Sequence, residues 1–182
     1  DGDGVDNEPF PVRVAVRIAG DSITFDFTGS SPQRRGPVNC AWGAHLSAVK
    51  TAFKALVSPH EPGNEGWFKP LSIIVPEGSV FSAVYPAPVC WHFEAGCHAS
   101  ELIWKALAPL APDRYGAGSY LSLCSTFICG TNPESGEPFI VVEPNVGGWG
   151  ASNDDDGASA LIGVSDGDTY NTSVELCEAK YP

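Results

Sequence analysis

Apolar and polar residues alternate strictly in the first structured part of the chain. Every second residue is apolar over residues 12–18, and the same period of two returns over residues 23–28. Because successive side chains of a strand point to opposite faces, this pattern predicts two strands that each bury one face. The pair Gly20-Asp21 between them is typical of a tight turn, so we expect a β-hairpin.

Two later stretches carry apolar residues at steps of three and four, which is the period of an amphipathic helix. The first predicts a helix over about residues 40–57, with Asn39 as its N-cap and Trp42 at the start of its buried stripe. The second predicts a helix over about residues 92–108. Between the two helices, the apolar run at residues 71–75 predicts a short buried strand.

From Ser119 onward the pattern is again that of strands separated by turns. We expect four strands there, at residues 120–129, 139–143, 158–164 and 174–177. The complete order of elements predicts an α+β fold with a mostly antiparallel sheet and two main helices. We expect residues 1–11 to be a linker or a frayed end and residues 12–182 to form a single domain.

Charge and composition exclude several classes of partner. The chain has 22 acidic and 10 basic residues, a net charge of −12. Such a surface repels phosphate backbones and anionic membranes, so we expect neither nucleic acid nor a membrane as partner. No apolar run approaches the roughly 20 residues that span a bilayer, and no segment is typical of a signal peptide, so we expect a cytoplasmic protein. The six cysteines are expected to be buried free thiols, because the chain is long, well supplied with core residues and not dense in cysteine.

The strongest catalytic candidates lie on the second predicted helix. His92 and Glu94 have the H-x-E spacing of zinc deaminases, but the cysteine pair that completes such sites is absent. Glu94, His98 and Glu101 stand at i, i+4 and i+7, where they could share a metal ion or a proton. The same spacing is common on solvated helix faces. Both interpretations stay open: His92, Glu94 and His98 are candidate catalytic residues, and no metal ligand is assigned in this chain.

Three other motifs lack the structural context that their chemistry needs. Residues 163–167 spell G-x-S-x-G, but no helix follows and all four histidines come earlier, which excludes a nucleophile elbow. Residues 153–157 lack the spacing and the final Glu of a calcium-binding EF-hand. The Gly-Gly-Trp-Gly run at 147–150 lacks the lysine of a phosphate loop, and its glycines permit close backbone approach or positive φ.

Arg34 and Arg35 lie side by side in a loop rich in glycine and proline. A guanidinium pair binds carboxylates or phosphates, or pairs with acidic residues of another subunit. Surface loops also carry arginine for solubility alone. The residues themselves leave these alternatives open.

Several ordered motifs resemble the hydantoinase B family, which includes the C-terminal halves of 5-oxoprolinases and the α subunits of acetone carboxylases. Residues 26–39 are similar to the family pattern Asp-Phe-Thr-Gly-Thr-Ser followed by Gly-Pro-x-Asn, with Ser30 at the usual Thr position. Further matches follow in order at Glu94, Pro112-Asp113-Arg114, Gly147-Gly148-x-Gly150-Ala151, Asp156-Gly157 and Asn171-Thr172. Ser173 departs from the family, which tends to have Pro there. The resemblance covers residues 12–182.

The resemblance implies an enzyme component rather than a complete enzyme. Such subunits are several hundred residues long, and this chain contains no Met, so we expect an internal portion of a larger subunit that is inactive alone. The implied reaction is ATP-dependent hydrolysis of a cyclic amide, such as a hydantoin, N-methylhydantoin, oxoproline or a lactam. The alternatives are the carboxylation of acetone or acetophenone, and a non-catalytic scaffold segment.

The resemblance also implies partners and cofactors. A hydantoinase A-like subunit is expected to bind ATP and Mg²⁺ and to phosphorylate the carbonyl oxygen of a cyclic amide or ketone, within a hetero-oligomer. A divalent metal is expected in the part of the subunit that precedes this portion. The residues expected to contact the substrate or another subunit are Arg34, Arg35, Asn39, Gly147, Gly148, Gly150 and Asp156.

Overall fold

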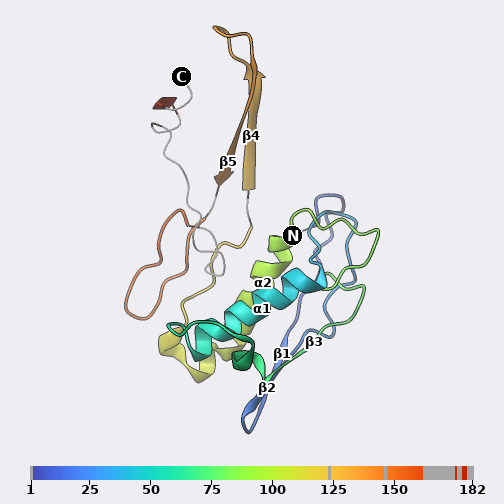
Figure 1. Ribbon diagram of the computed structural model, residues 1–182, viewed down its shortest axis with the longest axis vertical. Coiled ribbons are helices and arrows are strands. Elements are labelled where there is room, and N and C mark those ends of the chain that lie inside the picture. The colour runs from blue at the N-terminus through green and yellow to red at the C-terminus, as the bar shows by residue number, and fades with distance from the viewer. Residues whose placement is uncertain (1, 123, 146, 162–174, 176–177, 180–182) are drawn as a thin grey trace. The chain divides into compact units, whose positions relative to one another are not determined.

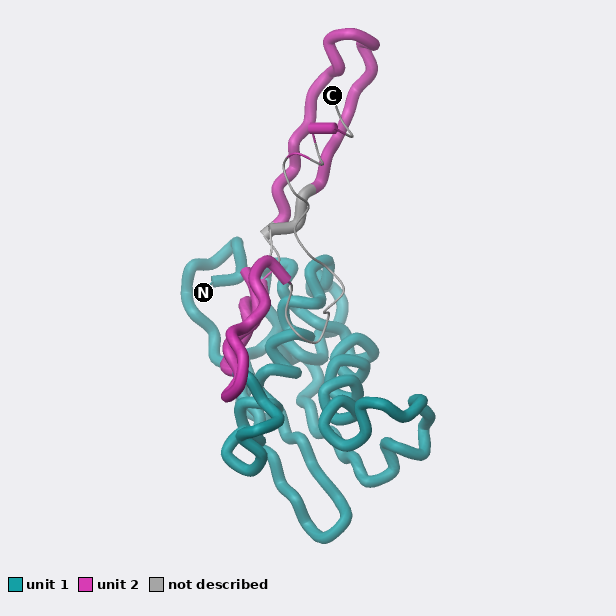
Figure 2. Tube along the Cα trace, turned by 90° about the vertical axis from the view of Figure 1, so that its left-hand side faces the viewer, with its two compact units in different colours: residues 1–116 teal, residues 117–182 magenta. Residues whose placement is uncertain are grey.

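The computed structural model describes residues 2–122, 124–145, 147–161, 175 and 178–179. The chain divides into two compact units, Asp1–Gly116 and Ala117–Pro182 (Figure 2). The first unit combines a small sheet with two helices, and the second contains a hairpin. The expected α+β class with two main helices is therefore confirmed, whereas a single domain over residues 12–182 stays a prediction.

The sheet of the first unit has three strands in the order β1 (Ala15–Ala19), β2 (Ser22–Asp26) and β3 (Leu71–Ile74). β1 and β2 form the predicted antiparallel hairpin, and Gly20 in its turn has a φ of +61°. β3 runs parallel to β2. Parallel neighbours require a crossover connection, and here that connection contains the first helix.

Helices α1 (Trp42–Val57) and α2 (His92–Leu107) pack together over one face of this sheet (Figure 1). The rings of Phe25 in β2 and Phe53 in α1 meet edge to face, with centroids 6.5 Å apart. Three short 3₁₀ helices, Glu65–Phe68, Ala108–Leu110 and Pro112–Arg114, lie in the connections. The large buried apolar residues of the core include Ile23, Phe25, Phe27, Val49, Phe53, Val80, Phe81, Ile103 and Leu107.

The start of α1 differs from the prediction. The helix begins at Trp42, its N-cap residue is Ala41, and no side chain caps it, so Asn39 is not the N-cap. Trp42 is 44% exposed rather than buried. It lies in the first turn of α1, where His45 rather than Trp42 is fully buried. Periodicity places a residue on a face of a helix, but it does not say how far the core extends along that face.

The second unit contains the antiparallel strands β4 (Cys124–Thr131) and β5 (Pro138–Asn145), which confirm the predicted hairpin with slightly different bounds. Of the strand predicted at 158–164, Ser159 forms one isolated bridge with Gly148, and residues 162–164 lie outside the described residues. The strand predicted at 174–177 lies outside them except for Glu175. No helix in the described part of the chain has the length and hydropathy of a membrane span.

Candidate functional site

The side chain of Asn39 holds residues 28–40, which we name the arginine loop, in a fixed shape. Its Oδ1 accepts the backbone N–H of Arg34 at 2.6 Å. Its Nδ2 donates to three backbone carbonyl oxygens, those of Arg34 at 2.9 Å, Gly36 at 3.1 Å and Pro88 at 2.8 Å. Asn39 is fully buried, so this amide is fully used inside the protein. It ties the loop to the segment that precedes α2.

Backbone hydrogen bonds fix the arginine loop against residues 78–84. Gln33 donates to Gly78 at 2.8 Å, and Cys40 donates to Val80 at 2.8 Å. Their pattern resembles a short irregular ladder, because Val80 and Ala83 donate back to the loop. The loop therefore has a defined position relative to the residues that follow β3.

Arg34 is used within the chain. Its guanidinium pairs with the carboxylates of Asp3, at 3.4 Å, and Asp6, at 3.6 Å, and it lies 5.0 Å from the centroid of the Phe10 ring. Arg35 is exposed and forms no ion pair with any residue that the structure describes. The two adjacent arginines thus differ: Arg34 is engaged by the first residues of the chain, and Arg35 is available to another molecule.

Asp3 is buried, although residues 1–11 were expected to be a linker or a frayed end with nothing to bury. Its carboxylate accepts backbone N–H groups from Gly36 at 3.0 Å, Val5 at 2.9 Å and Asp6 at 2.7 Å. The Gly36 hydrogen bond, then that of Asp6, and to a smaller extent the Arg34 charge, hold the pKa of this carboxyl well below its usual value. The acidic first residues are ordered because the arginine loop supplies donors for them.

Helix α2 brings two of the three candidate catalytic residues together. Glu94 and His98 are one turn apart on the same side, and His98 Nδ1 lies 2.6 Å from the backbone oxygen of Glu94. His92 precedes Glu94 by two positions and therefore lies on a different side of the helix, where it is exposed. No group of three or more His, Cys, Asp or Glu side chains suited to a metal occurs in the described ranges. Catalytic roles for these residues stay a prediction.

The glycine run at residues 147–150 crosses other backbone segments of the second unit. A Cβ at Gly150 would overlap the carbonyl group of Ala117, and Gly148 has a φ of +114°. Both uses expected for these glycines, close backbone approach and positive φ, are therefore present. The remaining two candidates of this unit, Gly147 and Asp156, are exposed.

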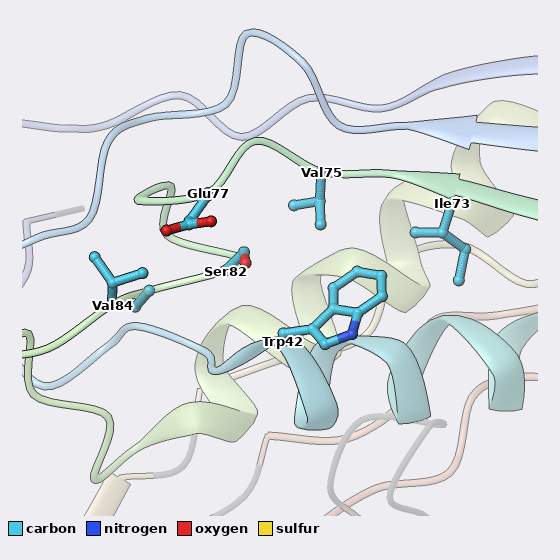
Figure 3. Close-up of a pocket in the computed structure, with 7 residues that line it drawn as sticks. Trp42, Ile73, Val75, Glu77, Ser82 and Val84 are labelled. Atoms are coloured by element: carbon cyan, nitrogen blue, oxygen red, sulfur yellow. The ribbon is translucent and has the colours of Figure 1, made fainter.

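An open hollow of about 450 Å³ lies between β3, the residues that follow it, and the start of α1 (Figure 3). The Trp42 indole faces Val75 and Ile73, whereas Glu77 and Ser82 lie together at the other end. Within the described residues, the Glu77 carboxylate and the Ser82 hydroxyl have no hydrogen-bond partner. The hollow thus offers an apolar wall and, beside it, one strong acceptor and one donor. Its lining residues are Trp42, Ile73, Val75, Glu77, Ser82, Ala83 and Val84.

No sequence motif marks the residues of this hollow as a site. They come from α1, from β3 and from the turn after it, and no motif joins these segments along the chain. The one available signal was an aromatic residue at the very start of a predicted helix. That signal is weak, because most aromatic residues on an apolar stripe are buried in the core.

A buried imidazole lies next to Trp42 in α1. His45 is fully buried, and its ring lies 4.5 Å from the Phe27 centroid and 5.0 Å from that of Phe81. Neither ring nitrogen has a hydrogen-bond partner in the described structure. Burial lowers the pKa of His45 to about 4, so the ring is neutral at pH 7. The sequence pattern did not distinguish this histidine from a surface one.

The cysteine side chains that the structure describes are free, as expected. Cys40 and Cys97 are also buried, as expected, whereas Cys90 and Cys129 are exposed, so the expected burial is wrong for these two. Burial raises the pKa of the Cys40 thiol to about 12, so this sulfur stays protonated and unreactive. The side chains of Cys124 and Cys177 lie outside the described residues.

Known proteins identify the family of this chain. The family model described as hydantoinase B/oxoprolinase matches residues 1–182. A 5-oxoprolinase from Pestalotiopsis fici is 29% identical over 178 residues, which cover 96% of this chain and 14% of that protein. The chain spans about a third or less of the length of the curated relatives that it matches.

Two solved structures share the fold. The crystal structure of an ATP-dependent caprolactamase from Pseudomonas jessenii has a TM-score of 0.76 and 24% identity, covering 94% of this chain and 30% of that one. A nucleotide-free acetone carboxylase has a TM-score of 0.71 and 18% identity, covering 93% of this chain and 23% of that one. At these identities the likeness concerns the fold alone.

Proposed function

Since this chain belongs to the hydantoinase B/oxoprolinase family, we propose that it is part of the B-type subunit of an enzyme that hydrolyses cyclic amides with consumption of ATP. The match of the family over residues 1–182 is the observation that carries this proposal. The names of two similar proteins, a 5-oxoprolinase and a caprolactamase, favour ring opening of an oxoproline or a lactam.

The hollow beside Trp42 is our candidate binding site for the ring. A small cyclic amide holds its N–H and C=O groups on the same side of the ring, next to methylene groups. Glu77 would accept the N–H and Ser82 would donate to the carbonyl oxygen, while the methylene groups lie on the Trp42 indole. An apolar wall with a few convergent polar groups is the usual composition of a small-molecule site.

The other candidate residues keep narrower proposed roles. Glu94 and His98 would transfer a proton during ring opening, since a carboxylate and an imidazole lie one turn apart on α2. Arg35 would contact an anionic intermediate or a neighbouring subunit, because it is exposed in a loop of fixed shape. Asn39 would position that loop rather than touch the substrate.

The cofactors are proposed for other parts of the assembly. We propose that a hydantoinase A-like subunit binds ATP and Mg²⁺, and that a part of the subunit beyond this chain holds a divalent metal. The described residues do not fit a metal site, because no group of three suitable side chains occurs among them. ATP-dependent turnover takes place where ATP is supplied, so we propose a cytoplasmic hetero-oligomer.

The test uses the complete subunit that contains this chain together with its ATP-binding partner. ATP hydrolysis and product formation are measured with hydantoin, N-methylhydantoin, 5-oxoproline, caprolactam and acetone, each with and without bicarbonate. We expect a cyclic amide to stimulate ATP hydrolysis and to be opened in buffer without bicarbonate. Turnover of acetone that requires bicarbonate, with no ring opening, would instead establish the carboxylase alternative, which the shared fold with acetone carboxylase favours.

A further inference from the structure

Glu77 is the one charged side chain among the described residues that line the hollow. The other lining side chains are apolar except for the Ser82 hydroxyl, and none of these described residues is Lys, Arg or His. A ligand in the hollow therefore meets a negative charge with no positive charge beside it. This asymmetry bears on which cyclic amides the hollow accepts.

Backbone hydrogen bonds hold the polar end of the hollow. The N–H of Gly78 donates to the carbonyl oxygen of Ser82 at 2.9 Å, and the N–H of Ser82 donates to that of Ser79 at 3.0 Å. Glu77 and Ser82 lie together at this end, on a turn whose backbone is fixed (Figure 3). Since the turn is ordered before a ligand arrives, binding does not have to order it.

The cationic side chains of neighbouring segments are engaged elsewhere or lie outside the hollow. Lys50 lies more than two turns beyond the start of α1, about 12 Å along the helix axis, and its ammonium group pairs with Glu65 at 2.9 Å. Arg34 is paired with two carboxylates, and Arg35 is exposed in the arginine loop without lining the hollow. No residue in the described part of the chain forms an ion pair with Glu77.

Cyclic amides differ in the group next to their ring N–H. In 5-oxoproline the carbon bonded to the ring nitrogen carries a carboxylate, which is ionised at neutral pH. In 2-pyrrolidinone the same five-membered lactam carries only hydrogen there. If Glu77 accepts the ring N–H, the carboxylate of 5-oxoproline lies beside that of Glu77, and the two negative charges repel each other. The wall formed by Trp42 and Val75 supplies no positive charge to offset this repulsion.

We propose that the hollow selects uncharged cyclic amides, such as simple lactams, and discriminates against 5-oxoproline through Glu77. This inference rests on the proposed function, and it narrows the substrate class that the names of the similar proteins leave open. Glu77 is exposed, so water screens part of the repulsion, and the expected preference is about 10-fold.

The experiment compares 2-pyrrolidinone with 5-oxoproline in the complete subunit together with its ATP-binding partner. Dissociation constants are measured without ATP by ligand-observed NMR titration, and kcat/KM is measured with ATP. Both quantities should favour 2-pyrrolidinone about 10-fold in wild type. Glu77→Gln should weaken binding of the lactam and change that of 5-oxoproline little, so the preference should nearly vanish. Glu61→Gln, at an exposed carboxylate outside the hollow, is the matched control and should keep the wild-type preference.

Ionic strength provides a measurement that needs no substitution and therefore no folded variant. The wild-type preference should fall about threefold between roughly 0.05 M and 0.5 M NaCl, because salt screens the repulsion. Both amides are compared under the same conditions, so an effect of salt on ATP binding or on subunit assembly cancels in the ratio. A preference that is the same at both salt concentrations would contradict selection by charge.

Each remaining outcome decides the proposal. If wild type binds 5-oxoproline as tightly as 2-pyrrolidinone, or if Glu77→Gln keeps the wild-type preference, selection through Glu77 is wrong while the proposed ring opening is unaffected. Loss of 5-oxoproline binding alone in Arg35→Gln would also overturn it, because Arg35 would then receive the carboxylate. If the expected preference in binding is found but neither amide is opened with ATP, the selection stands and the proposed function is wrong. If neither amide binds, the hollow is not a site for these rings and the selection is wrong.

Discussion

The carboxylate of Asp3 accepts a 3.0 Å hydrogen bond from the backbone N–H of Gly36, which lies 33 residues further along the chain. A Cβ at Gly36 would overlap the backbone of Asp3, so the contact requires glycine at this position. The segments around Asp3 and Gly36 have little apolar character, so hydrogen bonds rather than apolar packing hold them together. Asp3 and Asn39 both bind the backbone of Gly36 in the arginine loop, Asp3 through its N–H and Asn39 through its carbonyl oxygen.

Replacing Asp3 with Asn should lower the free energy of unfolding at pH 7. The native pKa of Asp3 lies below its unfolded value, so its stabilisation is complete above about pH 4 and is lost as the pH falls through the native pKa. Urea unfolding between pH 2 and pH 7 should therefore show a difference between wild type and Asp3→Asn that shrinks at the acidic end. Glu8→Gln, an exposed carboxylate, is the control and should differ little from wild type at any pH. A difference that grows toward pH 2 would contradict the assignment.

Replacing Asn39 with Asp should destabilise the protein more than replacing it with Ala. The isosteric carboxylate would face the carbonyl oxygens of Gly36 and Pro88 without a proton to donate, whereas Ala only leaves backbone groups unpaired. We expect a loss of roughly 2–4 kcal/mol for Asn39→Ala, measured by chemical denaturation. Asn64→Ala removes one exposed cap contact and is the control, with a loss of about 1 kcal/mol or less. Equal stability of the Asp and Ala variants would contradict this account.

Replacing His45 with Leu should remove a source of acid sensitivity. The pKa of His45 is lowered from 6.5 to about 4, so the stability that its neutral form contributes is complete above pH 6.5 and is lost as the pH falls toward 4. That drop corresponds to roughly 3 kcal/mol. Thermal unfolding at pH 7, 5.5 and 4.5 should show a smaller decline for His45→Leu than for wild type. His60→Leu, at an exposed position, should decline as wild type does, and parallel curves for all three proteins would contradict the prediction.

Substitutions in the hollow should weaken substrate binding in the complete enzyme. Glu77→Gln removes a charged acceptor and Trp42→Ala removes the apolar wall, so each should raise KM for a lactam about 10-fold with a smaller effect on kcat. Steady-state kinetics with caprolactam provides the measurement. Glu61→Gln and Trp67→Ala, outside the hollow, are the matched controls and should leave KM unchanged. An unchanged KM in both hollow variants would remove the hollow from the proposed site without affecting the proposed reaction.

Local sequence patterns were sufficient for the main elements of the fold. The period of two over residues 12–18 and 23–28 predicted the β1–β2 hairpin, and the helical period predicted α1 and α2 within about two residues of their ends. These patterns work because β2, α1 and α2 bury one side against the common core, which imposes the period of each element on the sequence. β1 contributes less, since Val16 is only partly buried and Ile18 is exposed. The ordered motifs were also sufficient to indicate the hydantoinase B family, whose model matches the whole chain.

Tertiary structure alone decided what the polar side chains do. From the sequence, Asn39 was an N-cap, Asp3 belonged to a frayed end, and Arg34 was equivalent to Arg35, whereas long-range contacts gave each of them a different role. Only the packed chain brought Trp42, Ile73 and Glu77 to the walls of one hollow. The physical reason is that burial of apolar residues follows a local period, whereas a hydrogen bond or an ion pair depends on a partner that any distant segment can supply.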